Sequence, residues 1–200
     1  MENQNGQTHT NLQTGTVTPQ MNHGGHEMLD VKDAIGGTID TLNQYMVLRP
    51  NVKCQELQRI MDHQHQFMLD EYNTTVESFQ SGQDPSNPTQ TYNMQENNDF
   101  VFGLKPSNPL KPMQNASEIS EEWISSRLLG SLKAGASMKT VASLESTNPV
   151  VRRVLADSVP NWIEMAYEIS IYQNKRGFYQ VPQFTEQDMQ QMLNSFSTTK

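Results

Sequence analysis

Cysteine is nearly absent from this sequence, which has one, Cys54, among 200 residues. No disulfide can therefore form within a single chain, as is typical of proteins made in a reducing cytoplasm. A cysteine inside a helical apolar pattern usually acts as a small buried hydrophobic residue. Cross-linking to another chain through Cys54 stays open.

Basic charge and long apolar runs are scarce as well. Fourteen Lys and Arg residues stand against 22 Asp and Glu, for a net charge of −8. A nucleic-acid binder needs a basic face, and so does a protein that binds anionic membrane surfaces. No run approaches the roughly 18 apolar residues of a membrane span, and residues 1–25 contain no apolar core of a secretory signal. We expect no nucleic-acid partner, no membrane insertion and no secretory signal.

The overall apolar content is low, at 34% of residues with a mean hydropathy of −0.69. Such a composition predicts a modest core with polar appendages. Residues 1–25 consist mainly of Gln, Asn, Thr and Gly, which predicts a disordered polar tail. We assign residues 26–200 to one folded domain.

Two long segments in the first half of this domain have apolar residues at steps of three and four, the pattern of amphipathic helices. The first extends from His26 to Met46, with the stripe Met28, Val31, Ile35, Ile39, Leu42 and Met46. The second extends from Val52 to Phe79, with Asn51 as its expected cap. Its stripe is Cys54, Leu57, Met61, His65, Met68, Tyr72, Val76 and Phe79.

Two more long helices are predicted in the second half. We expect Ser117 to cap the third, in which the small residues of "KAGAS" (133–137) allow close helix packing. Asn148 and Pro149 are a start signal for the fourth, which ends at Gly177. A short fifth helix is predicted over 185–196, where Thr185 and the residue three places later have capping-box spacing.

Residues 80–116 contain five prolines and no sustained periodicity. A gap of that length within a domain is typical of a crossover between distant ends. Short connections join the helices on either side of it into two antiparallel hairpins. The sequence therefore predicts an all-α fold, a ferritin-like four-helix bundle with one long crossover.

Three stretches of the chain resemble the spore coat protein F family, which has the Coat F domain. They are "HEMLDVKDAIGGTIDTLNQYM", "NPVVRRVLADSVPNWIEMAYEISIYQNKRGFYQVPQ" and "EQDMQQML", and the resemblance covers roughly residues 23–196. It implies a ferritin-like helical protein of endospore-forming bacteria, made in the cytoplasm during sporulation and located in the spore coat. It carries over no catalytic motif.

A ferritin-like fold raises the question of a two-metal site, and Asp62-x-x-His65 could be half of one. Such a site takes a Glu from each of two helices and a Glu-x-x-His pair from each of the other two. The matching half is missing, because no histidine follows His65 and the pair Glu164 and Glu168 is assigned to a solvated face with Asp157 and Asn161. We interpret His65 as a core histidine and Asp62 as its surface neighbour.

No further arrangement of residues indicates chemistry. His9, His23 and His26 in the polar tail could catch a soft metal ion, but a flexible tail explains them as well. The sequence lacks a phosphate-binding loop and a nucleophile motif. We predict no catalytic, cofactor-binding or metal site, no cofactor and no small-molecule substrate.

The function that these observations favour is a non-enzymatic structural component of the endospore coat. Its expected partners are spore coat proteins of different sequence, and self-association stays open beside them. The best candidate contact segment is "GFYQVPQF" (177–184), because interfaces are enriched in aromatic residues. Deleting the residues after Gly177 should impair coat incorporation, unless these aromatics fold back onto the bundle.

Two different functions are also compatible with the sequence. One is a ferritin-like metal-binding protein or oxidoreductase with a degenerate site, which would need a second acid-x-x-His pair on the fourth helix. The second is an adaptor whose N-terminal tail recruits a coat partner. Deleting residues 1–25 would separate such an adaptor from a protein that assembles by itself.

Overall fold

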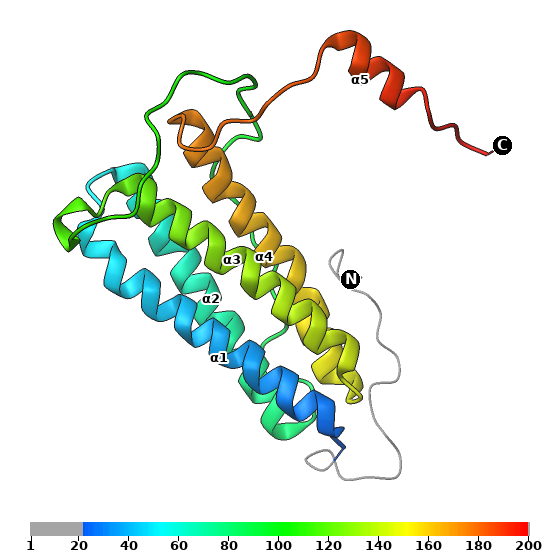
Figure 1. The fold of residues 1–200 in the computed structure, drawn as a ribbon. Helices are drawn as coiled ribbons and strands as arrows, with labels where there is room; N and C mark the ends of the chain where they lie inside the picture. Colours follow the sequence, from blue (N-terminus) through cyan, green and yellow to red (C-terminus); the bar gives the residue numbers. More distant parts are fainter. Residues whose placement is uncertain (1–21, 200) are drawn as a thin grey trace.

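The computed structural model describes residues 22–199, which form a four-helix bundle followed by a short C-terminal helix (Figure 1). This confirms the predicted all-α class. Short 3-10 turns lie at Arg49–Asn51 and Ala116–Glu118. The α-helices are α1 (Gly25–Leu48), α2 (Gln55–Ser81), α3 (Glu121–Glu145), α4 (Pro149–Lys175) and α5 (Glu186–Leu193).

The crossover connects opposite ends of the bundle. Helix α1 packs against α2 and α3, and α4 packs against α3 and α2. Helices α1 and α4 run in one direction while α2 and α3 run in the opposite one, so the segment between α2 and α3 must return along the whole bundle (Figure 1). This is the one-crossover connectivity of ferritin-like bundles.

Local cap signals predicted some helix ends correctly and others not. The side chain of Asn148 caps α4 by accepting from the backbone N–H groups of Val150 and Val151, and Thr185 caps α5. The predictions for two further caps were wrong. Ser120, and not Ser117, caps α3, and α2 begins after Cys54 because Asn51 lies in a 3-10 turn.

The two predicted apolar stripes of the first hairpin are rotated relative to the observed buried faces. In α1, Met28 and Met46 are 46% and 65% exposed. The buried face instead includes the polar residues Thr38 and Thr41, whose hydroxyls donate to carbonyls one turn earlier. A threonine that satisfies its own hydroxyl within the helix can face the core at little cost, and the hydropathy pattern does not reveal it.

Close packing between α3 and α4 depends on the predicted small residues. The indole ring of Trp162, which is fully buried, lies directly over Gly135. A Cβ atom at Gly135 would lie 2.0 Å from the ring, closer than any real contact. The close approach that "KAGAS" predicts is therefore confirmed at this glycine.

Candidate functional site

A layer of buried polar side chains crosses the middle of the bundle. Each of the four long helices contributes to it, together with one residue of the crossover. We call this set the polar layer: Tyr45, Gln64, Glu71, Tyr92, Lys139, Asn161 and Glu168. Two carboxylates and one ammonium thus lie in the interior, where an unpaired charge would be strongly unfavourable.

The first half of the polar layer centres on Glu71 of α2. The ammonium of Lys139, on α3, lies 3.2 Å from Oε1 of Glu71, and both side chains are almost fully buried. The indole N–H of Trp162 donates to the same oxygen at 2.6 Å, and the amide of Asn161 donates to Oε2 at 3.2 Å. Lys139 also lies 5.0 Å from the centre of the Trp162 ring. Each charge therefore has several partners, which is the condition for a buried ion pair to be tolerated.

The second half centres on Glu168 of α4, which corrects the sequence interpretation. Glu168 is fully buried, and Asn161 is 3% exposed, so this side of α4 is not solvated as predicted. The amide of Gln64 donates to Oε2 of Glu168 at 2.8 Å, and the backbone N–H of Gln95 donates to Oε1 at 2.7 Å. The hydroxyl of Tyr92 also donates to Glu168, and burial together with this carboxylate raises the pKa of Tyr92 well above its usual range.

These polar residues hold the crossover against α4. The side-chain oxygen of Asn161 accepts from the backbone N–H of Tyr92, and its amide donates to the carbonyl of Gln90. Nearly two turns beyond Glu168, Asn174 pairs with both backbone groups of Val101. The crossover has almost no regular structure of its own, so its backbone groups must be satisfied by side chains. These hydrogen bonds hold the extended crossover along α4.

The polar layer does not have the donors of a two-metal site. Within the described range 22–199, no three His, Cys, Asp or Glu side chains are grouped so that they could hold a metal ion. In the polar layer, Glu71 and Glu168 are the two carboxylates, and the ammonium of Lys139 lies against one of them. A fixed ammonium at that distance supplies the positive charge that a bridging metal would otherwise provide. These residues do not fit the metal centre that a ferritin-like connectivity suggests.

The motif that raised the metal hypothesis forms an ion pair instead. Asp62 is exposed, and its two oxygens accept from Nε and Nη2 of Arg49 at 2.6 and 2.7 Å. This hydrogen-bonded guanidinium lowers the pKa of Asp62. His65 is half-buried beside Arg49 in a small cavity of about 150 Å³, and the core position predicted for it belongs to its neighbour Gln64. The interpretation of Asp62 as a surface residue is thus confirmed, and that of His65 as a core residue was wrong.

Histidines of the predicted tail behave differently from one another. His9 lies outside the described residues. Nδ1 of His23 lies 2.7 Å from Oε1 of Glu27, and the His23 ring packs edge-to-face on Phe79. The buried carboxylate of Glu27 in turn accepts from the backbone N–H groups of Thr147 and Asn148, so it joins the start of α1 to the α3–α4 turn. The domain boundary at residue 26 stays a prediction.

Cys54 lies at the N-terminus of α2 and is half-buried. Nη2 of Arg176 lies 3.0 Å from its sulfur. Burial alone would raise the pKa of Cys54, but the groups around the sulfur lower it; the backbone N–H of Leu57 has the largest effect of these, and the guanidinium of Arg176 has a smaller one. All of these contacts lie within the chain, so the question of a disulfide from Cys54 to another chain stays open.

The candidate contact segment divides into two parts. Phe178 packs against the core, and Val181 forms a single parallel bridge with Phe102 of the crossover. Beyond this bridge Phe184 is 67% exposed. The first part therefore folds back onto the bundle, and the second part begins an exposed arm.

Comparisons with known proteins place these elements in context. Residues 120–182 match the family model described as the Coat F domain, which spans α3, α4 and the segment up to the arm. Over 174 residues the chain is 51% identical to the spore coat protein F-like protein YhcQ of Bacillus subtilis (strain 168), an alignment that covers 87% of this chain and 80% of that relative. No solved structure matches the chain. Within residues 22–199, none of the helices has the length and apolar character needed to cross a membrane.

Proposed function

The chain belongs to the spore coat protein F-like family, and from that premise we propose that it is a structural component of the bacterial endospore coat. It acts in the coat by association with proteins and carries out no reaction. Its partners are coat proteins of different sequence and further copies of this chain.

The observation that carries this proposal is the contrast between a closed interior and an apolar exterior. In the polar layer, the carboxylates of Glu71 and Glu168 are engaged by donors from the protein itself. The charges of these carboxylates are therefore already compensated within the fold. On the outside, by contrast, exposed apolar side chains gather near the C-terminus, where Met192, Leu193 and Phe196 are 58%, 71% and 86% exposed. Exposed apolar side chains that lie together are typical of association sites.

The experiment that tests the proposal is localisation during sporulation. The full chain carries a fluorescent protein fused at its N-terminus and is expressed in a sporulating host from the endospore-forming bacteria. We expect fluorescence in a shell around the developing spore, and the chain in coat extracts of purified spores. Fluorescence that stays dispersed in the cell throughout sporulation would contradict a coat role.

The deletion after Gly177 that the sequence suggested can be replaced by a shorter one that removes the exposed arm alone. Ending the chain after Gly177 would remove the core contact of Phe178 and the bridge of Val181. A chain that ends after Pro182 keeps both contacts and loses the arm alone. If this shorter chain folds and still enters the coat as wild type does, the arm takes no part in assembly.

A further inference from the structure

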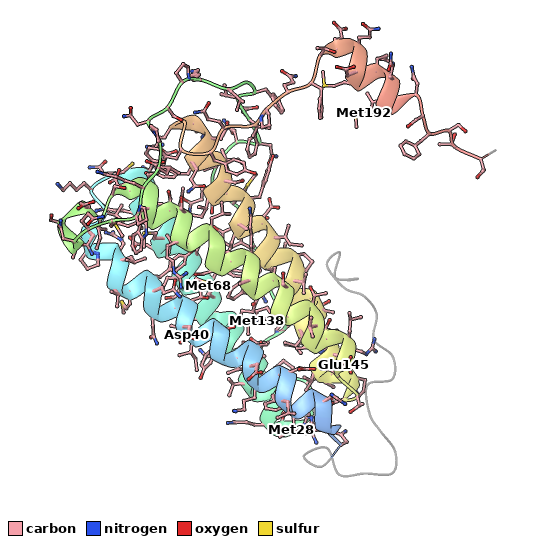
Figure 2. The ribbon with its side chains drawn as sticks, in the orientation of Figure 1. Met28, Asp40, Met68, Met138, Glu145 and Met192 are labelled. Atoms are coloured by element: carbon pink, nitrogen blue, oxygen red, sulfur yellow. The ribbon has the colours of Figure 1, made fainter. Side chains whose placement is uncertain are left out.

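The C-terminal arm, residues 183–196, projects from the bundle with its apolar side chains uncovered. Figure 1 shows α5 beyond the end of α4, apart from the four long helices. None of its residues is buried. Met192, labelled on this helix in Figure 2, is 58% exposed, and its neighbour Leu193 is 71% exposed. A helix of eight residues is not stable alone in water, so it gains most from a surface that covers its apolar side.

The apolar residues of the arm have the spacing of a helix that binds in a groove. Met189, Met192 and Leu193 stand at positions i, i+3 and i+4 of α5, and Phe196 follows three residues after the helix ends. Amphipathic helices that lie in hydrophobic grooves use anchors at this spacing. Methionine suits such a surface because its flexible thioether adapts to the shape of the partner.

A matching groove lies on the outer side of α3 and α4. Its volume is about 800 Å³, and its walls come from α3, α4, the crossover and the segment before the arm. Ile163 of α4 lines it and is 55% exposed, and Phe102 of the crossover is 57% exposed. Further apolar and aromatic lining residues are Phe100, Ala136, Tyr167 and Tyr179. At about 1.5 Å per residue, α5 is roughly 12 Å long.

Charge favours the same pairing. Lys133 is the one charged residue among those that line the groove. Residues 183–199 contain two acids, Glu186 and Asp188, and no Lys or Arg. The acids lie in the first turn of α5, ahead of the apolar anchors. An arm docked in the groove therefore brings an acidic end to a basic one, which sets its direction.

The root of the arm leads it away from its own bundle. The carbonyl of Val181 accepts from the backbone N–H of Gly103 at 2.9 Å, which fixes this point of the chain on the crossover. Residues 182–185 then contain no helix or turn, and they begin with Pro182, whose ring fixes its backbone angle. A second molecule can meet the arm without any change in this connection.

We propose that the arm of one copy docks in the groove of a second copy. Each copy then offers an arm at one end and a groove on its side, so the contact is heterologous and joins copies head to tail into open chains or rings. Open-ended association of this kind suits a protein that builds an extended layer. The partner in this proposal is a second copy of the same chain. The docking itself can be tested without the coat role, and it rests on the proposed function only for the place where the copies assemble.

The test uses the full chain and two complementary variants. In the arm variant, Met192→Asp is combined with Leu193→Asp. In the groove variant, Ile163→Asp places a charge on the groove wall at a position that is already exposed. Val47→Asp is the matched control, because Val47 is 70% exposed on α1, which does not line the groove. Sedimentation velocity is measured over a range of protein concentrations.

We expect wild type and the Val47→Asp control to form oligomers that grow with concentration, and each of the two variants alone to be monomeric. An equal mixture of the two variants should form dimers and nothing larger, since it contains one intact arm and one intact groove per pair. A mixture that stays monomeric overturns the proposal, as does a groove variant that associates like wild type. A monomeric wild type whose arm resists proteolysis also overturns it, because the arm would then occupy its own groove. Coat localisation of the wild-type chain in that case would leave the proposed function standing.

Discussion

The polar layer and the C-terminal arm reverse the usual arrangement of charged and apolar side chains. In the polar layer, charged groups such as Lys139 and Glu71 are inside, and each has several partners within the chain. In the arm, apolar side chains such as Leu193 are largely exposed, and no residue of α5 is buried. The first arrangement contributes to folding, because its donors and acceptors are satisfied internally. The second contributes to association under the docking proposed above, because burying its apolar surface against another molecule is favourable.

The buried ion pair should give the largest effect on folding. Lys139→Met leaves the carboxylate of Glu71 in the interior without its cation, and breaking a buried pair in this way costs about 3–5 kcal/mol. We expect this loss in the free energy of unfolding measured by chemical denaturation. Glu71→Gln added to Lys139→Met removes the second charge and should recover part of the loss. A single variant as stable as wild type would mean that the pair is not formed.

The buried carboxylate at the start of α1 should give a smaller effect that depends on pH. Burial opposes ionisation of Glu27, but hydrogen bonds from His23, Asn148 and Thr147 outweigh it and lower its pKa below its usual 4.5. A lowered pKa in the folded state means a contribution to stability that is complete above about pH 4.5 and is lost as the pH falls through the folded value. Glu27→Gln should therefore cost about 1.5–3 kcal/mol at neutral pH.

The measurement for this carboxylate is denaturation of wild type and Glu27→Gln from neutral to acidic pH. The difference between the two curves should shrink below pH 4.5. Glu186→Gln on the exposed arm is the control and should follow wild type throughout. A difference that does not change with pH would show that the charge of Glu27 contributes nothing.

The close contact between α3 and α4 should be sensitive to a single methyl group. Gly135→Ala places a Cβ 2.0 Å from the Trp162 ring, so the indole or the helix must shift. Overpacking of this kind costs about 1–3 kcal/mol. Gly36→Ala is the control, because no atom lies near a Cβ at that position, and it should be neutral or stabilising. Equal melting temperatures for Gly135→Ala and wild type would contradict the packing.

The arm should give the smallest effect on folding. Met192→Asp with Leu193→Asp changes exposed side chains and no core contact, so we expect a change within about 0.5 kcal/mol in the free energy of unfolding. The measurement is denaturation at protein concentrations too low for association. A loss comparable to that of Lys139→Met would mean that the arm is part of the folded core, and the contrast between the two regions would fail.

The elements predicted correctly from the sequence depend on local chemistry. Asn148 and Thr185 cap their helices through contacts with residues two or three positions away, so their signals are readable in a short window. The crossover and the connectivity followed from the lengths of the connections. Gly135 was found because small residues cluster around it. Ser117 was wrong as a cap because Ser120 takes that role, and Asn51 was wrong because it lies in a 3-10 turn before α2.

The polar layer was not predicted because its hydrogen-bond partners lie far apart in the sequence. A carboxylate such as Glu168 looks like a surface residue in any pattern of hydropathy. Its partners in the crossover, Tyr92 and Gln95, lie 76 and 73 residues earlier in the chain. One signal in the sequence could have indicated it, since Gln64 and Glu71 lie in step with the buried apolar residues Leu57, Met61 and Met68 of α2.

The most direct test of the account compares coat incorporation of the arm variant with that of the Val47→Asp control in sporulating cells. Both variants are measured in coat extracts of purified spores, from strains whose only copy of the chain is the variant. The account predicts that the chain with Met192→Asp and Leu193→Asp folds normally but is lost from the coat, while Val47→Asp is incorporated like wild type. Equal incorporation of the two variants would contradict the central claim that the exposed arm assembles this protein.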